Sequence, residues 1–443
     1  MQVGRLLRSF SERIESAKSE RARMSVQMAV AADSDPASGD PTVNLLFQAQ
    51  RIKAEAGEPW KIYKDRVLGA LAGPRKAVEQ VIGVKCKARV AANTLTCRVP
   101  MKQAVALGKH APDLDLKLVE LDPFVDLCSM DDAVDDIGLA TFEKKFRFAG
   151  RGVRVAIIDS GVDEKHPYLQ VHNSISTCDE IEDIPGRHGT HCAGSIASTH
   201  PLYRGVAPEV LLINIKALRS NGTGNHDFIT AGIDAALDAD AEVLSMSIGF
   251  NHLPAWSDGG HGWECRDGTC PLCSAVDTAA TTDRRIVVVA AGNEHIRADT
   301  LRQRNLQGEF DTELGCPGQA RTALTVGAHT KQTFHRAPFS SLGPASYPDA
   351  PDKPDIYAPG VNITSTIPVP RDAKGEPLGN LTVSRLFGRL SGTSMATPIV
   401  AGAACLLVQL YGIADRDRIV AELVARSSPM ADGPTGRLDL SGL

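Results

Sequence analysis

The sequence has no excess of charge of either sign and no uninterrupted hydrophobic run long enough to cross a bilayer. Its 443 residues carry a formal net charge of -5, with a sequence pI near 6.2. This balance gives no electrostatic footprint for nucleic acid or for an anionic membrane. The longest apolar runs are Ile286–Ala291 and Met395–Leu410, and Pro398 interrupts the second. We therefore expect no nucleic-acid partner and no membrane partner.

The first residues also lack the hydrophobic region of a secretory signal. Ser9, Glu12, Arg13 and Glu15 interrupt any apolar stretch there. We therefore expect a cytoplasmic protein. In a reducing compartment the ten cysteines would stay mostly as thiols, whereas an oxidising compartment would pair them.

Composition divides the chain into five segments. Residues 1–30 have apolar residues at helical spacing and predict an amphipathic helix, and residues 31–41 are rich in turn formers and predict a linker. Residues 42–122 predict a small domain. An acidic connector follows over residues 123–136. Residues 137–443 then predict one large α/β domain.

The predicted small domain contains segments with the hydrophobic periodicity of helices and segments with that of strands. Its pattern predicts a strand, a helix broken near Gly73-Pro74, two strands, a short helix and a last strand, at Val43–Gln48, Trp60–Ile82, Lys85–Val90, Thr94–Val99, Lys102–Lys109 and Leu116–Leu121. This β-α-β-β-α-β order suggests an α+β domain of the ferredoxin-like type.

The large domain alternates apolar β-branched runs with helical patterns. Strands are predicted at Val153–Ile158, Val210–Lys216, Val243–Met246, Ile286–Ala290 and Ala323–Gly327, and helices at Thr190–Ser198, Asp227–Leu237, Cys273–Thr282 and Ile399–Leu410. This alternation predicts a mostly parallel sheet covered by helices on both faces, with functional residues at the carboxyl ends of the strands. A nucleotide-binding protein of this class needs a Gly-x-Gly-x-x-Gly turn at its first helix, and the sequence lacks it.

Four polar residues lie at positions where such a fold usually carries its catalytic or binding side chains. Asp159 follows the first buried strand, His188 opens a helix, Asn293 follows another buried strand, and Ser394 precedes an apolar helix. Each alone has an ordinary structural explanation, such as a helix cap. Together, in the chain order Asp, His, Ser, they match one known permutation of the catalytic triad.

The motifs around these residues resemble the signature blocks of subtilisin-like serine proteases of the S8 family. The blocks are Asp159-Ser160-Gly161, His188-Gly189-Thr190-His191, Ala291-Gly292-Asn293 and Ser391-Gly392-Thr393-Ser394-Met395-Ala396-Thr397-Pro398. The resemblance implies a three-layer subtilisin-like fold and a serine endopeptidase that needs no cofactor for catalysis. It implies that Ser394 is the nucleophile, that His188 is the general base, that Asp159 orients the imidazole, and that Asn293 donates to the oxyanion.

The same resemblance assigns substrate contacts. Ser247, Ile248, Gly249, Ala291, Gly292 and Gly315 would line the pocket for the residue before the scissile bond, and Gly224 would lie on the edge that pairs with the substrate backbone. Small residues at these places imply a roomy pocket, and main-chain pairing implies broad selectivity among protein or peptide substrates. Glu294 follows Asn293, where a carboxylate at the rim would favour a basic side chain, and a solvated charge is the alternative.

The small domain has the position and predicted order of the propeptide of this family. The resemblance implies that it assists folding, inhibits the cleft, and is removed by self-cleavage between Leu121 and Asp136. An alternative is a subtilisin-fold protein that its N-terminal domain keeps inhibited and that acts mainly as a binding or regulatory protein.

Two features depart from the family pattern. The segment from Thr199 to Arg204 is short and lacks the ligands of the usual calcium loop, so that calcium site is expected to be absent and other calcium sites stay open. A long segment from Phe250 to Arg285 holds weak zinc candidates, for which a disulfide or free thiols are alternatives: His261, Cys265, Cys270 and Cys273. Cys192, next to His191, is similar to a buried thiol beneath the catalytic histidine in some members of the family.

Overall fold

The computed structural model describes most of residues 42–443. The described ranges are 42–48, 52–100, 117–121 and 134–443, apart from positions 56, 93, 135, 181–183, 202, 266, 283, 348–351, 373, 380 and 382. The expected helix over 1–30, the linker 31–41, the helix 102–109 and most of the acidic connector lie outside these residues.

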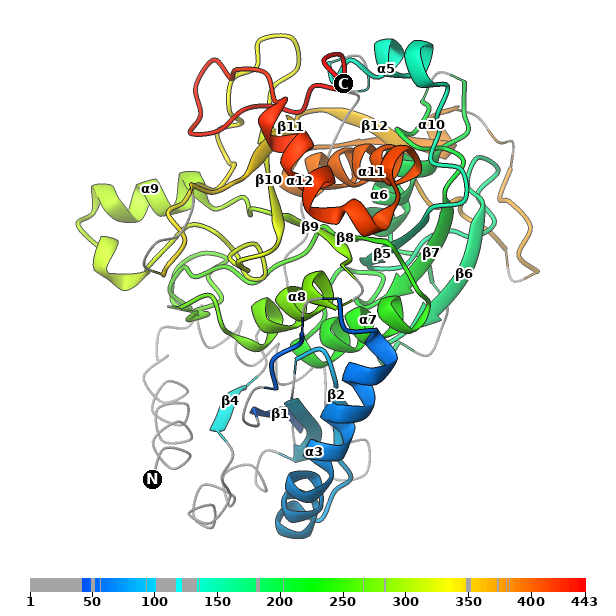
Figure 1. Cartoon of the computed structure of the whole chain (residues 1–443). Coiled ribbons are helices and arrows are strands. Elements are labelled where there is room, and N and C mark those ends of the chain that lie inside the picture. Colours follow the sequence, from blue (N-terminus) through cyan, green and yellow to red (C-terminus); the bar gives the residue numbers. More distant parts are fainter. Residues whose placement is uncertain are drawn as a thin grey trace.

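A seven-stranded sheet forms the centre of the larger part of the chain (Figure 1). Its order is β11-β10-β9-β8-β5-β7-β6, and every neighbouring pair is parallel. The strands are β5 Arg154–Asp159, β6 Val171–Ser176, β7 Leu211–Lys216, β8 Val243–Met246, β9 Ile286–Ala290, β10 Leu324–His329 and β11 Ile356–Pro359. The chain adds β6 and β7 on one side of β5 and later strands on the other. The switch point, where doubly wound sheets place their sites, therefore lies at the end of β5.

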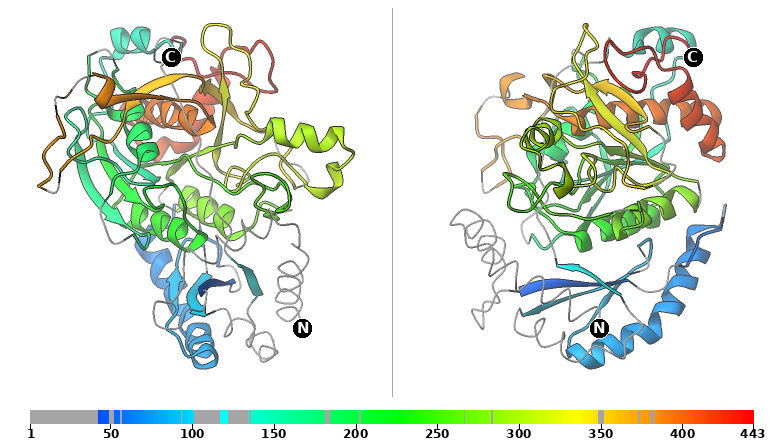
Figure 2. Two further views of the ribbon diagram at one scale, coloured as in Figure 1. Left: turned by 180° about the vertical axis from the view of Figure 1, so that it is seen from behind. Right: turned by 90° about the vertical axis from the view of Figure 1, so that its left-hand side faces the viewer.

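Helices cover both faces of this sheet, which gives the expected three-layer α/β fold (Figures 1 and 2). Ala156 and Ile158 of β5 pack in the apolar cluster with α7 and α8. Val155 and Ile157, which point to the opposite face, pack with α6, α11 and α12. The helices are α5 Leu139–Phe146, α6 Arg187–Ala197, α7 His226–Asp238, α8 Pro271–Thr281, α9 His295–Gln303, α10 Val383–Leu386, α11 Thr393–Tyr411 and α12 Arg416–Ala425.

All five strands predicted in the large domain form within about two residues of their expected bounds. The sequence pattern missed the two edge strands. β6 is exposed along much of its length, and β11 is four residues long and ends in Pro359, so neither shows the long buried run that marks a central strand. It also missed a small antiparallel pair, β12 Ile363–Thr366 and β13 Phe387–Leu390.

The helix that carries Ser394 begins earlier than expected. The apolar pattern predicts a start at Ile399, whereas α11 begins at Thr393 and includes Pro398. Among the described residues, this helix is also the one whose length and hydropathy would suffice for a membrane span, but 89% of the relevant window is buried inside the protein. It is therefore the central helix of the domain.

The small domain contains a four-stranded antiparallel sheet of order β2-β3-β1-β4. Its elements are β1 Thr42–Gln48, α3 Trp60–Ile82, β2 Lys87–Arg89, β3 Thr94–Pro100 and β4 Lys117–Leu121. This is the strand order of a ferredoxin-like unit. The expected break near Gly73-Pro74 is wrong, because α3 continues through it and ends at Gly83, whose φ of 69° suits glycine.

The small domain lies against α7 and α8 (Figures 1 and 2). Trp60, Tyr63 and Leu95 share one apolar cluster with residues of both helices. Arg89 forms an ion pair of 2.6 Å with Asp227 at the start of α7. Burial of apolar area together with polar contacts makes this a specific interface rather than a loose tether.

Candidate active site

Asp159 is the last residue of β5, at the switch point of the sheet. Its side chain is 1% exposed, and one carboxylate oxygen, Oδ1, accepts hydrogen bonds from the Ser160 amide at 2.6 Å and the Ser160 hydroxyl at 3.0 Å. A buried carboxylate needs such donors to remain charged. The end of the strand therefore presents a fixed negative charge toward α6.

His188 lies in the first turn of α6 and faces this charge. Its Nδ1 is 2.9 Å from both carboxylate oxygens of Asp159. Burial, the largest single influence, lowers the pKa of His188, but the charge and hydrogen bond of Asp159 together with those of Cys192 outweigh it and raise the pKa well above its ordinary value. Because a carboxylate only accepts, Nδ1 carries the proton and the neutral ring has its lone pair on Nε2. Nε2 is buried and has no hydrogen-bond partner among the described residues.

Ser394 lies in the first turn of α11, next to the same region. Pro398 has no N–H group, so the Ser394 carbonyl lacks the bond that a regular helix would give it. Two side chains hydrogen-bond to that carbonyl instead: the Ser247 hydroxyl donates to it at 2.5 Å and the Cys192 thiol at 3.6 Å. The Cys192 sulfur is also 3.8 Å from His188 Nδ1, so this buried thiol contacts both the imidazole and the Ser394 backbone, and it lies against the histidine as the resemblance implied.

Asn293 follows β9 and reaches the same helix end. Its carboxamide oxygen accepts hydrogen bonds from the Thr393 amide at 2.9 Å and from the Thr393 hydroxyl at 3.3 Å. These two bonds orient the carboxamide, since its oxygen is the end engaged by Thr393. The N-terminus of α11, where Ser394 lies, is a region of positive electrostatic potential that would favour an anion.

Glu294 is not at the rim of a pocket, and the expectation of a rim or solvated charge is wrong. Its side chain is buried, and burial raises the pKa of its carboxyl group. One carboxylate oxygen accepts from the Asn293 amide at 2.6 Å and from the Ser341 hydroxyl at 3.2 Å. Glu294 therefore holds the backbone turn that carries Asn293.

The remaining predicted pocket residues gather around two short backbone segments. Phe250 and Cys316 exchange two backbone hydrogen bonds of 2.8 Å, and the Gly315 amide donates to the Ala291 carbonyl at 3.0 Å. A side chain at Gly249 would approach the Cys316 carbonyl to 3.1 Å. Ser247 and Ile248 precede this segment, the Gly292 amide donates to the Thr393 hydroxyl at 3.2 Å, and Gly224 lies two residues before α7.

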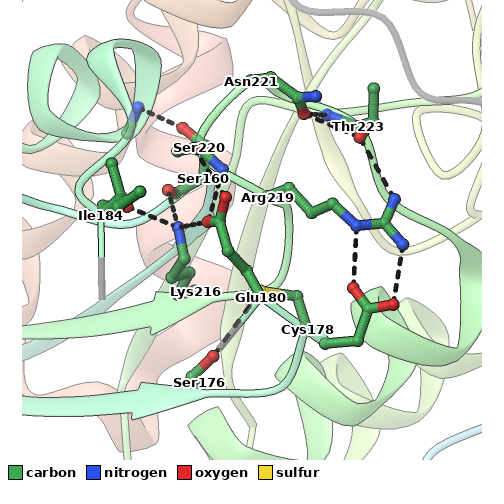
Figure 3. A network of polar contacts seen from close by, with 12 residues as sticks. Ser160, Ser176, Cys178, Glu180, Ile184, Lys216, Arg219, Ser220, Asn221 and Thr223 are labelled. Carbon is green, nitrogen blue, oxygen red and sulfur yellow. Dashed lines mark hydrogen bonds and ion pairs between the residues drawn. The ribbon is translucent and has the colours of Figure 1, made fainter. Parts of the chain in front are cut away.

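Lys216 was not predicted as a site residue. It is buried at the end of β7, where its backbone pairs with Asp159 of β5. Figure 3 shows its ammonium group beside Ser160, Glu180 and Ile184. Its ammonium group donates to the carbonyl oxygens of Ser160 and Ile184 and pairs with Glu180 at 2.8 Å. Burial raises the pKa of Glu180, but the bonds from Lys216 and Ser220 outweigh burial and lower it. A buried lysine is costly unless paired, so this network fixes the loop that leads into α6 and His188.

The zinc candidates fall into two groups. Cys265, Cys270 and Cys273 lie together, and Cys316 joins them in place of His261. The His261 ring instead accepts a hydrogen bond from the Asn251 amide at 3.0 Å. The side chain of Cys316 is fully buried.

The fold and this site define a class of protein: α/β proteins with an acid, an imidazole and a serine at the carboxyl edge of a parallel sheet. A profile described as the subtilase family, Peptidase_S8, matches residues 150–438. The chain belongs to this family.

Individual proteins are also similar to this chain. Over 270 residues the chain is 33% identical to subtilisin NAT of Bacillus subtilis subsp. natto, which covers 60% of this chain and 57% of that protein. It is 32% identical over 301 residues to an intracellular serine protease of Paenibacillus polymyxa, covering 64% of this chain and 77% of that protein. A crystal structure of a cold adapted subtilisin-like serine proteinase aligns with a TM-score of 0.47 and 26% identity, covering 66% of this chain and 90% of that one.

Proposed function

We propose that this chain is a serine endopeptidase that hydrolyses peptide bonds in proteins or peptides through an acyl-enzyme intermediate. The observation that carries the proposal is the buried Asp159–His188 pair of 2.9 Å, whose remaining ring nitrogen has no partner among the described residues. A buried lone pair without a donor is costly in a structural histidine. It is what a general base needs before its substrate arrives.

Each residue of the site has a step in the reaction. The Ser394 hydroxyl attacks the peptide carbonyl while His188 Nε2 accepts its proton, and the same imidazolium then protonates the leaving amine. Asp159 holds the ring and stabilises its positive charge. The Asn293 carboxamide and the Ser394 backbone amide donate to the oxyanion at the N-terminus of α11. Water then reverses the same steps to release the acid.

A fluorophosphonate probe tests this proposal, because it reacts only with an accessible, activated serine. We expect one labelled residue, Ser394, in the chain whose N-terminal domain has been cleaved off, and no labelling of His188→Ala. No labelling in any processed form of the chain would refute the peptidase proposal. Labelling only after forced removal of the N-terminal domain would favour the alternative of a regulatory protein held inhibited.

The small domain is proposed as the inhibitor and folding aid of the large one. Asp234 of α7 accepts hydrogen bonds of 2.9 Å from the Val90 and Ala91 amides in the turn between β2 and β3. The Arg89–Asp227 ion pair lies at the start of α7, whose cap residue Asn225 directly follows Gly224 of the predicted substrate edge. Docking on α7 thus holds the small domain beside the edge where an extended substrate would pair.

This interface should loosen as pH rises, because burial raises the pKa of Asp234 to about 6. A carboxyl group whose pKa is higher in the docked state takes up a proton on docking. Its contribution to the free energy of docking is therefore complete below about pH 4 and is lost as pH rises through about 6. In full-length Ser394→Ala, we expect hydrogen exchange of β2 and β3, corrected for intrinsic rates, to speed up between about tenfold and a hundredfold over this window. Asp234→Asn should abolish this pH dependence of hydrogen exchange, and Asp258→Asn, an exposed control, should keep it. The opposite slope would contradict the role of Asp234.

A further inference from the structure

Four cysteine side chains meet at one point behind the predicted substrate pocket. The sulfur atoms of Cys265, Cys270, Cys273 and Cys316 all lie within 4.8 Å of one another. Cys265 precedes α8, Cys270 caps it, Cys273 lies in its first turn, and Cys316 comes from a distant segment next to Gly315. Three of the four are buried and Cys270 is partly exposed. None of the steps of the proposed reaction uses them.

The spacing of these sulfur atoms is that of ligands around a central ion. Cys273 is 4.0 Å from Cys265 and 3.5 Å from Cys316, sulfur to sulfur. With zinc–sulfur bonds of about 2.3 Å, a tetrahedral site separates its sulfur atoms by about 3.8 Å. A disulfide would need about 2.05 Å. All four are free thiols, and the two distances from Cys273 lie close to the spacing of such a metal site.

The surroundings favour thiolates. The Cys270 amide points at the Cys265 sulfur at 3.4 Å, and the Cys273 amide points at the Cys270 sulfur at 3.5 Å. Cys270 and Cys273 also lie at the positive end of the α8 dipole. The Gln319 side-chain amide donates to the Cys316 sulfur at 3.9 Å. His252 Nε2 is 3.4 Å from the same sulfur but is an acceptor, because Nδ1 of this ring donates to Asp311 at 2.6 Å. Metal sites have such an outer layer of donors, which a cluster of packed neutral thiols does not need.

We propose that Cys265, Cys270, Cys273 and Cys316 bind one zinc ion in a tetrahedral site. Four protein sulfur ligands leave no position for water or substrate, so the ion has a structural role. Each thiol releases its proton to solvent on binding, and no redox step is involved. The Cys270-x-x-Cys273 spacing supplies two ligands from the start of one helix. The long segment after Phe250 supplies Cys265 as the third, and Cys316 is the fourth.

The ion would join three segments that surround the predicted pocket. Cys316 is bonded through its backbone to Phe250, and it adjoins Gly315, whose amide donates to Ala291. Zinc would thereby tie this wall to α8 and to the segment before it. The site itself does not depend on the proposed peptidase activity; only its effect on the pocket rests on that function.

The first test uses full-length Ser394→Ala, purified under reducing conditions without chelator. Elemental analysis should find about one zinc per chain, as a single four-sulfur site requires. Titration with a mercurial should release this zinc as four thiols react, which a chromogenic chelator can follow. Replacing zinc by cobalt should give the strong visible bands of a tetrahedral thiolate site. Absence of metal, or two disulfides in place of the thiols, would overturn the proposal, and stoichiometric iron would overturn the choice of zinc.

A second test uses variants. Cys270→Ser alters the most exposed ligand and should fold, yet it should lose most of the bound zinc and lower the thermal midpoint. Cys405→Ala, which changes a buried thiol of α11 outside the cluster, is the matched control and should keep its zinc. Zinc retained by Cys270→Ser at full stoichiometry would show that the ion binds elsewhere. Should Cys270→Ser fail to fold, the mercurial titration of the parent chain still decides.

Discussion

Replacing Ser394 by alanine should lower kcat for peptide hydrolysis by about six orders of magnitude, the loss that removal of the nucleophile or the base causes in enzymes of this mechanism. The reason is that the reaction then has no covalent intermediate, and His188 has no hydroxyl to deprotonate. KM should change little, because the hydroxyl contributes to chemistry rather than to binding of an extended chain. Hydrolysis of a chromogenic peptide, with single-turnover controls, measures both constants.

Two further variants test whether the loss of activity is specific to the Ser394 hydroxyl. Ser391→Ala, three residues away, removes a hydroxyl that accepts a hydrogen bond from the Asn362 amide at 2.9 Å, and it should keep most of the activity. The double variant His188→Ala with Ser394→Ala should be no slower than either single variant, since residues that act as one unit are not additive. Losses that multiply in the double variant would show that His188 and Ser394 act independently, contrary to the proposed mechanism.

The same substitution tests self-processing. A chain that cleaves itself between Leu121 and Asp136 should remain full length as Ser394→Ala when produced without other proteases. Adding a small amount of active enzyme should then restore the cleavage, because the substrate segment is unchanged. Cleavage of purified Ser394→Ala on its own would reject self-processing and leave the peptidase proposal standing.

The sequence was sufficient to predict the central strands and the site residues that end them. Buried strands are runs of β-branched residues, and a polar residue directly after such a run must lie at the carboxyl edge of the sheet. Asp159 is the last residue of β5, and Asn293 lies three residues after Ala290, which ends β9. The start of α11 was placed too late, because Pro398 reads as a boundary. In the structure side chains from other segments take up the carbonyl that Pro398 leaves free.

The contacts that the sequence did not reveal all join residues far apart in the chain. Lys216 was read as the end of a strand, yet its ammonium group fixes the loop before His188. Cys316 completes a cluster whose other members lie about fifty residues earlier. Glu294 was read as a surface charge because glutamate usually is one. Only the packing of Ser341 against it shows the buried position.

Replacing Asp159 by asparagine should lower kcat by about four orders of magnitude, as in triads where the acid becomes an amide of the same shape. An amide can donate to Nδ1, which favours the tautomer with the proton on Nε2, and that tautomer cannot accept the proton of Ser394. The loss of negative charge also removes what stabilises the imidazolium that forms in the transition state. The packing should survive, since the two side chains have nearly the same volume.

The pH dependence separates this electrostatic role from a structural one. In the parent chain kcat/KM should fall as pH decreases, when His188 takes up a proton, and this acid limb should lie above the ordinary histidine value because Asp159 raises the pKa of His188. In Asp159→Asn the negative charge that opposes the effect of burial is gone. Burial then lowers the pKa of His188, so the acid limb of kcat/KM should move to lower pH. Asp258→Asn, an exposed control in the large domain, should leave rate and limb unchanged. An acid limb that stays in place in Asp159→Asn, with the fold intact by circular dichroism, would mean that Asp159 does not set the charge of His188.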